Sequence, residues 1–245
     1  MTTGELDLKA KLRFAREAVL AQLTGLPGMV RAHLTDGPKT PVLLTLSVPP
    51  DTALARNVLD LARSSYPDPL LGHCLRTWLW ADLFGTLDGL APDAEALYVA
   101  SLLHDIALTD RFRPDESAAC FAIHGSEVAR TTLRSLGAEA SYADEVARAI
   151  ALHMDTHVPR DRGTEAYLLQ AGAHLDVAGT RAADLPRTAI REVVARHPRD
   201  GFPACFGTLM RRESTERPNS RAALLWRLGM RLPLHHNPLD RRKGI

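Results

Sequence analysis

His104 and Asp105 stand side by side in an apolar stretch of the sequence. Residues 93–108 are small or apolar on nearly every side, which predicts a helix that is buried all round. A carboxylate in such a helix must be compensated, because a buried charge is strongly unfavourable unless it is paired or binds a metal ion. A helix-end aspartate beside a hydrogen-bonded core histidine is the ordinary interpretation of such a pair. Further ligand-type residues along the chain favour a metal site instead.

Four more side chains of the ligand type occur on other predicted helices, each where the helix turns its apolar face inward. They are His73 in a helix over 70–87, His124 at the start of a helix over 124–136, His153 in a helix over 141–153, and Asp176 in a helix over 164–179. Neutral imidazole and carboxylate are ligands of divalent cations such as zinc, iron, manganese and cobalt. The sequence therefore predicts a metal centre to which several helices contribute.

The remaining segments also predict helices, so the expected fold class is all-α. Apolar residues at helical spacing predict a first helix over 8–24, which Gly25 and Pro27 close. Thr52 begins a second helix that runs to about residue 64. Residues 42–48 are strand-like, but a single strand makes no sheet. After the last ligand, the sequence predicts three short helices, over 186–196, 203–213 and 220–229.

The composition is that of an ordinary globular protein. Of the 245 residues, 45% are hydrophobic and 24% are charged, and the net charge of +1 comes from interleaved acidic and basic residues. This pattern argues against a nucleic-acid or anionic-membrane partner. The three cysteines, Cys74, Cys120 and Cys205, are too few and too scattered for a disulfide framework. With no secretory or membrane-spanning segment in view, we expect a cytoplasmic protein with a small-molecule substrate, either monomeric or a homo-oligomer.

The order H…HD…D, with additional histidines between, resembles the HD-domain superfamily of metal-dependent hydrolases. Four segments are similar in particular to cyanamide-hydratase-like HD proteins: residues 67–78, 102–109, 149–153 and 170–179. The resemblance covers roughly residues 50 to 210. It implies a single helical HD-domain bundle over 50–210, with an N-terminal helical extension over 1–49 and a C-terminal helical tail over 211–245.

The resemblance also implies a set of zinc ligands, namely His73, His104, Asp105 and Asp176. Many cyanamide-hydratase-like chains have an acidic residue where this chain has His124, which is similar to the third histidine of two-metal HD proteins. With His124 and His153 the chain has six potential ligands. The number of metal ions, and the choice between zinc, which is favoured, and mononuclear or dinuclear iron, therefore stay open.

A bound divalent metal lowers the pKa of water from 15.7 to about 7 and so produces hydroxide at neutral pH. We therefore expect a metal-dependent hydratase or hydrolase, with a hydro-lyase of the cyanamide hydratase type favoured. As a direct ligand, Asp105 would be essential for turnover. Arg76 would steady a developing anion or pair with a ligand carboxylate, and His124 or His153 would deliver a proton.

Two other enzyme classes remain as alternatives. A dinuclear iron HD-domain oxygenase would use the six-ligand set to activate dioxygen. An HD phosphohydrolase acting on a nucleotide or phosphate ester would need a phosphate clamp, for which Arg76, Arg111 and Arg113 are the candidates. A degenerate HD module that only binds is disfavoured by the intact ligand set.

Several residues near the ligands are interpreted as structural. His157 follows His153 by four residues, but the helix is expected to end between them. His174 precedes Asp176 by two residues and is expected to face another way. Cys74 is typical of a small core residue.

Overall fold

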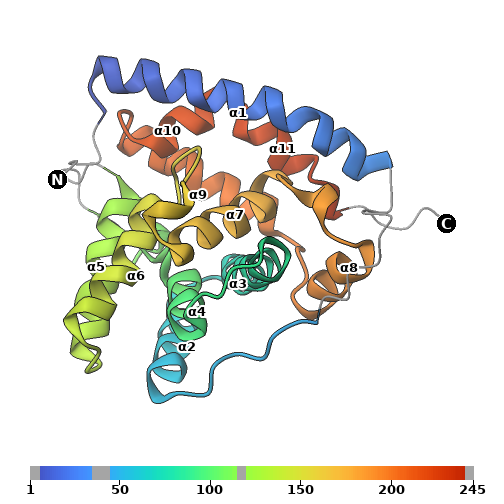
Figure 1. Ribbon diagram of the computed structural model, residues 1–245. Coiled ribbons are helices and arrows are strands. Elements are labelled where there is room, and N and C mark those ends of the chain that lie inside the picture. Colours follow the sequence, from blue (N-terminus) through green and yellow to red (C-terminus); the bar gives the residue numbers. More distant parts are fainter. Residues whose placement is uncertain (1–5, 35–44, 115–119, 241–245) are drawn as a thin grey trace.

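The computed structural model describes residues 6–34, 45–114 and 120–240, and within these ranges it contains helices and no strand (Figure 1). This confirms the all-α prediction. The helices are α1 (Leu8–Leu34), α2 (Ala53–Ser65), α3 (Asp68–Asp88), α4 (Ala94–Leu103), α5 (Phe121–Ser135), α6 (Ala140–Leu152), α7 (Thr164–Ala178), α8 (Arg187–Arg196), α9 (Phe202–Glu216), α10 (Arg221–Leu225) and α11 (Arg231–His235).

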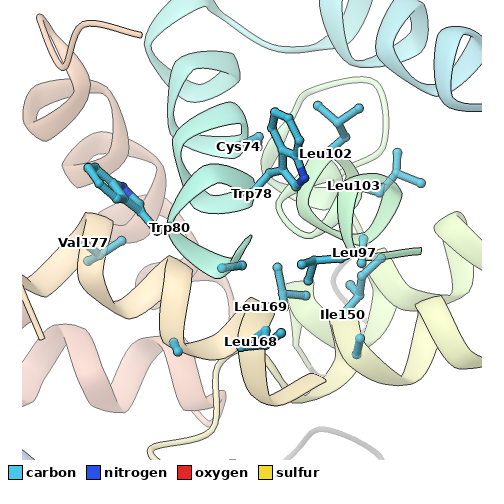
Figure 2. Close-up of a cluster of buried hydrophobic side chains, with 14 of the residues drawn as sticks. Cys74, Trp78, Trp80, Leu97, Leu102, Leu103, Ile150, Leu168, Leu169 and Val177 are labelled. Carbon is cyan, nitrogen blue, oxygen red and sulfur yellow. The ribbon is translucent and has the colours of Figure 1, made fainter. Parts of the chain in front are cut away.

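Helices α3 and α7 pack against each other at the centre of the fold. Gly172 of α7 permits their close approach, because an added Cβ would lie 2.4 Å from the carbonyl oxygen of Thr77 on α3. Helices α4 and α6 pack beside this pair, and Figure 2 shows Leu97, Ile150 and Leu169 from these elements in one apolar cluster. The core therefore fixes four helices: α3 and α7 carry predicted ligands, and α4 and α6 end directly before others.

The histidine–aspartate pair lies on a turn and not within a helix, which corrects the predicted helix over 93–108. Helix α4 ends at Leu103, and Asp105 has φ −107° and ψ 11°. A 3₁₀ turn follows over Ile106–Leu108. The pair therefore emerges from the end of a buried helix, where side chains have more freedom of direction than along its face.

The first helix is longer than predicted. Helix α1 continues through Gly25 and Pro27 to Leu34. The missing N–H of Pro27 leaves the carbonyl of Leu23 without a partner. Both residues are exposed on this helix, which lowers the cost of a proline inside a helix. Of the strand-like run over 42–48, residues 42–44 lie outside the described residues, and 45–48 form no regular structure.

The C-terminal region wraps back over the bundle. The predicted boundary between residues 210 and 211 falls inside α9. Helices α10 and α11 are joined by a π-helical turn, Trp226–Met230, in which Gly229 has φ 101°. Helix α1 packs on α10 and on this turn. None of the described helices has both the length and the apolar composition needed to cross a membrane.

Candidate metal centre

Three of the predicted ligands meet at one buried point. Nε2 of His73 lies 3.2 Å from Nε2 of His104, and Oδ2 of Asp105 lies 3.5 Å from the first nitrogen and 3.4 Å from the second. Each of the three residues is only 1% exposed. Nε2 of His153 lies 3.7 Å from Oδ1 of Asp105. The His73, His104 and Asp105 side chains form a candidate metal site.

Two of the histidines occupy the C-terminal cap of a helix. His104 follows α4, and its Nδ1 donates to the carbonyl of Ser101 at 2.8 Å. His153 follows α6, and its Nδ1 donates to the carbonyl of Ile150 at 2.6 Å. Because a carbonyl only accepts, the proton of each neutral ring is on Nδ1, and Nε2 carries a lone pair. The cap thus satisfies a carbonyl of the last helical turn and directs Nε2 toward the centre.

His73 also directs its Nε2 toward the centre of the cluster, but its ring is held by other side chains and not by a helix carbonyl. Its Nδ1 lies 2.8 Å from Oδ2 of Asp176 on α7, and its ring stacks on Phe202 of α9 with centroids 4.7 Å apart. Since a carboxylate accepts, the proton of His73 is on Nδ1 and its Nε2 also carries a lone pair. The Nε2 atoms of His73 and His104 therefore face each other with no proton between them.

The unsatisfied atoms of this cluster fit a divalent cation. Among the described residues, Oδ2 of Asp105 and Nε2 of His153 are buried without a hydrogen-bond partner. Buried polar atoms are ordinarily paired, and no atom of this cluster can act as the missing donor. The lone pairs of His73 and His104 and the carboxylate of Asp105 form a donor set that suits zinc or iron, with Nε2 of His153 beside it. A cation held by these three residues would satisfy the Asp105 carboxylate and the two facing nitrogens.

Asp176, the fourth predicted ligand, lies on the Nδ1 side of the His73 ring. Its carboxylate accepts hydrogen bonds from Nε of Arg76 at 2.8 Å and from Nε1 of Trp80 at 2.9 Å, and it lies 3.0 Å from a guanidinium nitrogen of Arg199. Burial alone would raise the pKa of this carboxyl, but the two arginines hold it well below its usual range. Asp176 therefore orients His73, and its direct contact with a metal stays a prediction.

Burial keeps the cap histidines neutral. Desolvation lowers the pKa of His104 below its usual value, although the nearby Asp105 acts in the opposite direction. The pKa of His153 is lowered well below its usual value, again mainly by burial. Neutral imidazole is the form that binds metal ions. Nε2 of His104 and Nε2 of His153 are therefore available at neutral pH without the loss of a proton.

A small cavity lies beside the cluster. Its volume is ≈ 30 Å³, and its wall consists of His73, His104, Asp105, His153, His174, Met154, Ala173, Val177, Phe206, Leu225 and Met230. A water molecule needs about 10–15 Å³ on this measure. The cavity therefore has room for about two water molecules or for a molecule of a few heavy atoms.

His174 belongs to this wall. It faces another way than Asp176, as predicted, but this face lines the cavity, which corrects its interpretation as a residue outside the site. Ala173, His174 and Val177 turn toward the cavity, while Asp176 on the same helix turns toward α3. The Gln170 amide nitrogen lies near two backbone carbonyls and 3.1 Å from Nδ1 of His174, so it donates to that ring. Burial lowers the pKa of His174 to about 4. The spacing i, i+1, i+4 of the three wall residues was the available sequence signal.

Two predicted catalytic residues lie away from the cavity. Arg76 is fully buried, and its guanidinium binds Asp176 and the carbonyls of His197 and Pro198. It thus takes the second of its two predicted roles, pairing with a ligand-type carboxylate. His124 is partly exposed in the first turn of α5, and among the described residues it belongs neither to the cavity wall nor to the buried cluster.

The weaker candidates also lie outside the cavity. Burial raises the pKa of the Cys74 thiol well above its usual value, which argues against a nucleophilic role. His157 is exposed. Of the two loop arginines, Arg111 is exposed and Arg113 pairs with Glu216 at 3.1 Å.

The helical fold and its buried His/His/Asp group are those of an HD-domain metalloprotein. The family model described as HD domain matches residues 70–224, and the chain belongs to this family. Two proteins of Saccharomyces cerevisiae, cyanamide hydratase DDI2 and cyanamide hydratase DDI3, are each 30% identical to it over 176 residues, which cover 69% of this chain and 76% of each relative. These similarities support a metal-dependent enzyme related to cyanamide-hydratase-like HD proteins.

Proposed function

We propose that this protein is a zinc-dependent hydratase that adds water across the carbon–nitrogen triple bond of a small neutral molecule such as cyanamide. The observation that carries the proposal is the cavity of ≈ 30 Å³ that adjoins the buried donor set. The names of the two yeast relatives support the same reaction.

The size and polarity of the cavity favour a small neutral substrate. Sites for drug-sized ligands have volumes of about 300–1,000 Å³, far above the volume of this cavity. Its wall, as described, contains no arginine or lysine, so it offers no clamp for a phosphate group. Both observations disfavour a nucleotide or a phosphate ester.

The donor set favours a single ion. A catalytic zinc site uses three protein ligands and keeps one position open, and we assign His73, His104 and Asp105 to these places. His124, which a six-ligand dinuclear site requires, lies apart from the cluster. When bound, a divalent ion lowers the pKa of water to about 7 and polarises the atom under attack.

His153 is the residue best placed to move a proton. Its Nε2 faces the cavity, lies 3.7 Å from Oδ1 of Asp105 and has no hydrogen-bond partner among the described residues. Hydration joins the oxygen of water to the carbon of the triple bond and a proton to its nitrogen. His153 accepts the proton from water and returns it to the nitrogen. Burial lowers the pKa of His153, so the ring is neutral and the lone pair of its Nε2 is free.

Metal analysis and a substrate panel test this proposal together. The full chain, purified without added metal, is analysed for zinc and iron. The zinc-loaded protein is then assayed with cyanamide, short nitriles and nucleotides, and the iron-loaded protein is tested for oxygen consumption. We expect about one zinc per chain and turnover of cyanamide.

Two variants serve as a matched pair in these assays. His104→Ala should abolish turnover, whereas His157→Ala, at an exposed histidine outside the site, should preserve it. Turnover confined to nucleotides would establish a phosphohydrolase, and strict dependence on iron and dioxygen would establish an oxygenase. Either result refutes the hydratase.

A further inference from the structure

The outer face of α1 carries most of the exposed large apolar side chains. Among the described residues eleven such side chains are exposed, and eight of them belong to α1. They are Leu8, Leu12, Val19, Leu20, Leu23, Leu26, Val30 and Leu34, with exposures between 41% and 77%. Single exposed apolar side chains are ordinary, but a contiguous group marks an interaction surface. We call this group the α1 stripe.

The α1 stripe points outward because the opposite side of the helix is anchored. Phe14 and Ala18 are buried. Nζ of Lys11 donates to Oδ1 of Asn219 at 2.6 Å, and the Gln22 amide donates to a backbone carbonyl in the π-helical turn at 3.3 Å. Figure 1 shows α1 along one edge of the molecule, with the other helices on one side of it.

The spacing of the α1 stripe is symmetric about residue 21. The symmetric pairs, at thirteen, nine and two residues from this position, are Leu8 with Leu34, Leu12 with Val30, and Val19 with Leu23. A two-fold axis at this position would therefore bring apolar side chains of one helix against those of an antiparallel copy. Such self-complementarity is what a two-fold homodimer interface requires.

The charges on α1 favour an antiparallel pair over a parallel pair. Residues 8–17 contain four of its five basic side chains, of which Lys9, Arg13 and Arg16 are exposed and Lys11 is held on the anchored side. Parallel helices would place two basic halves side by side, which is repulsive. Antiparallel helices place each basic half against residues 18–34, where Arg31 is the only residue of the Lys, Arg, Asp and Glu types.

The area of the α1 stripe indicates a reversible dimer. A helix of 27 residues is about 40 Å long and about 10 Å wide, so the footprint is about 400 Å² on each partner. Stable complexes bury about 800 Å² on each partner, and weaker ones bury less. Pairing through α1 alone should therefore depend on protein concentration.

We propose that two copies of this chain associate through antiparallel pairing of their α1 stripes. The occupant of this surface is thus a second copy of the same chain. The pairing buries apolar side chains that the monomer leaves in water, and it leaves the metal centre on the other side of α1 unobstructed.

Analytical ultracentrifugation over a range of protein concentrations tests the association. We expect the full chain to pass from monomer to dimer as its concentration rises. The double variant Val19→Glu/Leu23→Glu should stay monomeric, while Val48→Glu, at an 83% exposed apolar residue outside the α1 stripe, should dimerise like the parent. Equal thermal stability of both variants at low concentration shows that they fold. A parent that stays monomeric throughout, or a double variant that still dimerises, overturns the proposal.

Disulfide trapping tests the orientation. Leu12→Cys and Val30→Cys chains are mixed and oxidised, with the parent chain as the control for the native cysteines. We expect a disulfide between the two different variants. A disulfide that forms only between two Leu12→Cys chains would overturn the antiparallel arrangement. If the chain stays monomeric and binds anionic phospholipid vesicles through α1, the partner of the α1 stripe is a membrane surface, and the proposal of a second copy is overturned.

Discussion

The replacement Gly172→Ala should loosen the metal centre without touching any ligand. The new Cβ would lie 2.4 Å from the carbonyl oxygen of Thr77 and 3.0 Å from the backbone nitrogen of Ala81. Ordinary carbon–oxygen contacts are at least about 3.3 Å long, so α3 and α7 must separate by about 0.9 Å. The hydrogen bond between His73 and Asp176, now 2.8 Å long, would then approach about 3.7 Å, which is too long for a hydrogen bond.

Two measurements follow from this geometry. Overpacking costs about 1–3 kcal/mol, which corresponds to a Tm lower by about 2–12 °C for a chain of this size. Loss of the group that orients a metal-binding histidine lowers metal affinity about 10- to 100-fold. Calorimetry and competitive chelator titration measure the two effects. The matched control is Gly207→Ala, whose Cβ would meet its nearest atom at 3.6 Å and should leave both quantities unchanged or raise Tm slightly. Unchanged Tm and zinc affinity in Gly172→Ala would refute the reasoning.

Four further expectations concern the ion, the proton carrier, the buried charges and the effect of pH. Removing the metal should lower Tm by about 5–11 °C, since a ligand present at 100 times its Kd contributes about 2.7 kcal/mol; calorimetry before and after chelation, with zinc re-addition as the control, measures this. His153→Gln should reduce kcat by about 100-fold or more with zinc content unchanged; zinc loss in parallel with activity would instead make it a ligand. Asp176→Asn should lower the free energy of unfolding in urea by about 3–5 kcal/mol, because Arg76 and Arg199 stay buried without their carboxylate. A loss below about 1 kcal/mol would show that this ion-pair network does not stabilise the fold. The metal-free chain should also lose stability as pH falls from about 6.5, because the lowered pKa of His174, about 4, means that the unfolded chain binds the proton more readily; a urea midpoint that does not fall between pH 7.5 and pH 5 would contradict this.

The helices and most of the cluster were predictable from the sequence because periodicity reports which face of a helix is buried. His73 and Asp176 lie on regular helices, and each is buried where its apolar face predicts. His104 and Asp105 are adjacent in sequence, so any compact fold keeps them together. What periodicity does not report is the direction of a side chain at a helix end, where the backbone leaves the helical path.

The errors have physical causes that single residues make clear. Pro27 is expected to end the first helix, but it lies on the exposed side of α1, where the carbonyl that it leaves without a partner can face water. His174 was assigned to packing because it does not share a face with Asp176. The face of α7 that carries His174 lines the cavity, however, while the face that carries Asp176 contacts α3, so two faces of one helix serve the site. Only the tertiary arrangement shows where the cavity lies.

The two cap histidines link the folding of the chain to its chemistry. Within a helix, a histidine ring finds no free carbonyl in the turn before it, so neither of its nitrogens is fixed by the backbone. At the end of α4 and of α6, the carbonyls of the last turn can accept further hydrogen bonds, and the Nδ1 atoms of His104 and His153 donate to them. The same hydrogen bond that ends each helix therefore sets the tautomer and aims Nε2 at the centre. The apolar surroundings keep both rings neutral, so the positive charge that balances Asp105 is left for the ion to supply.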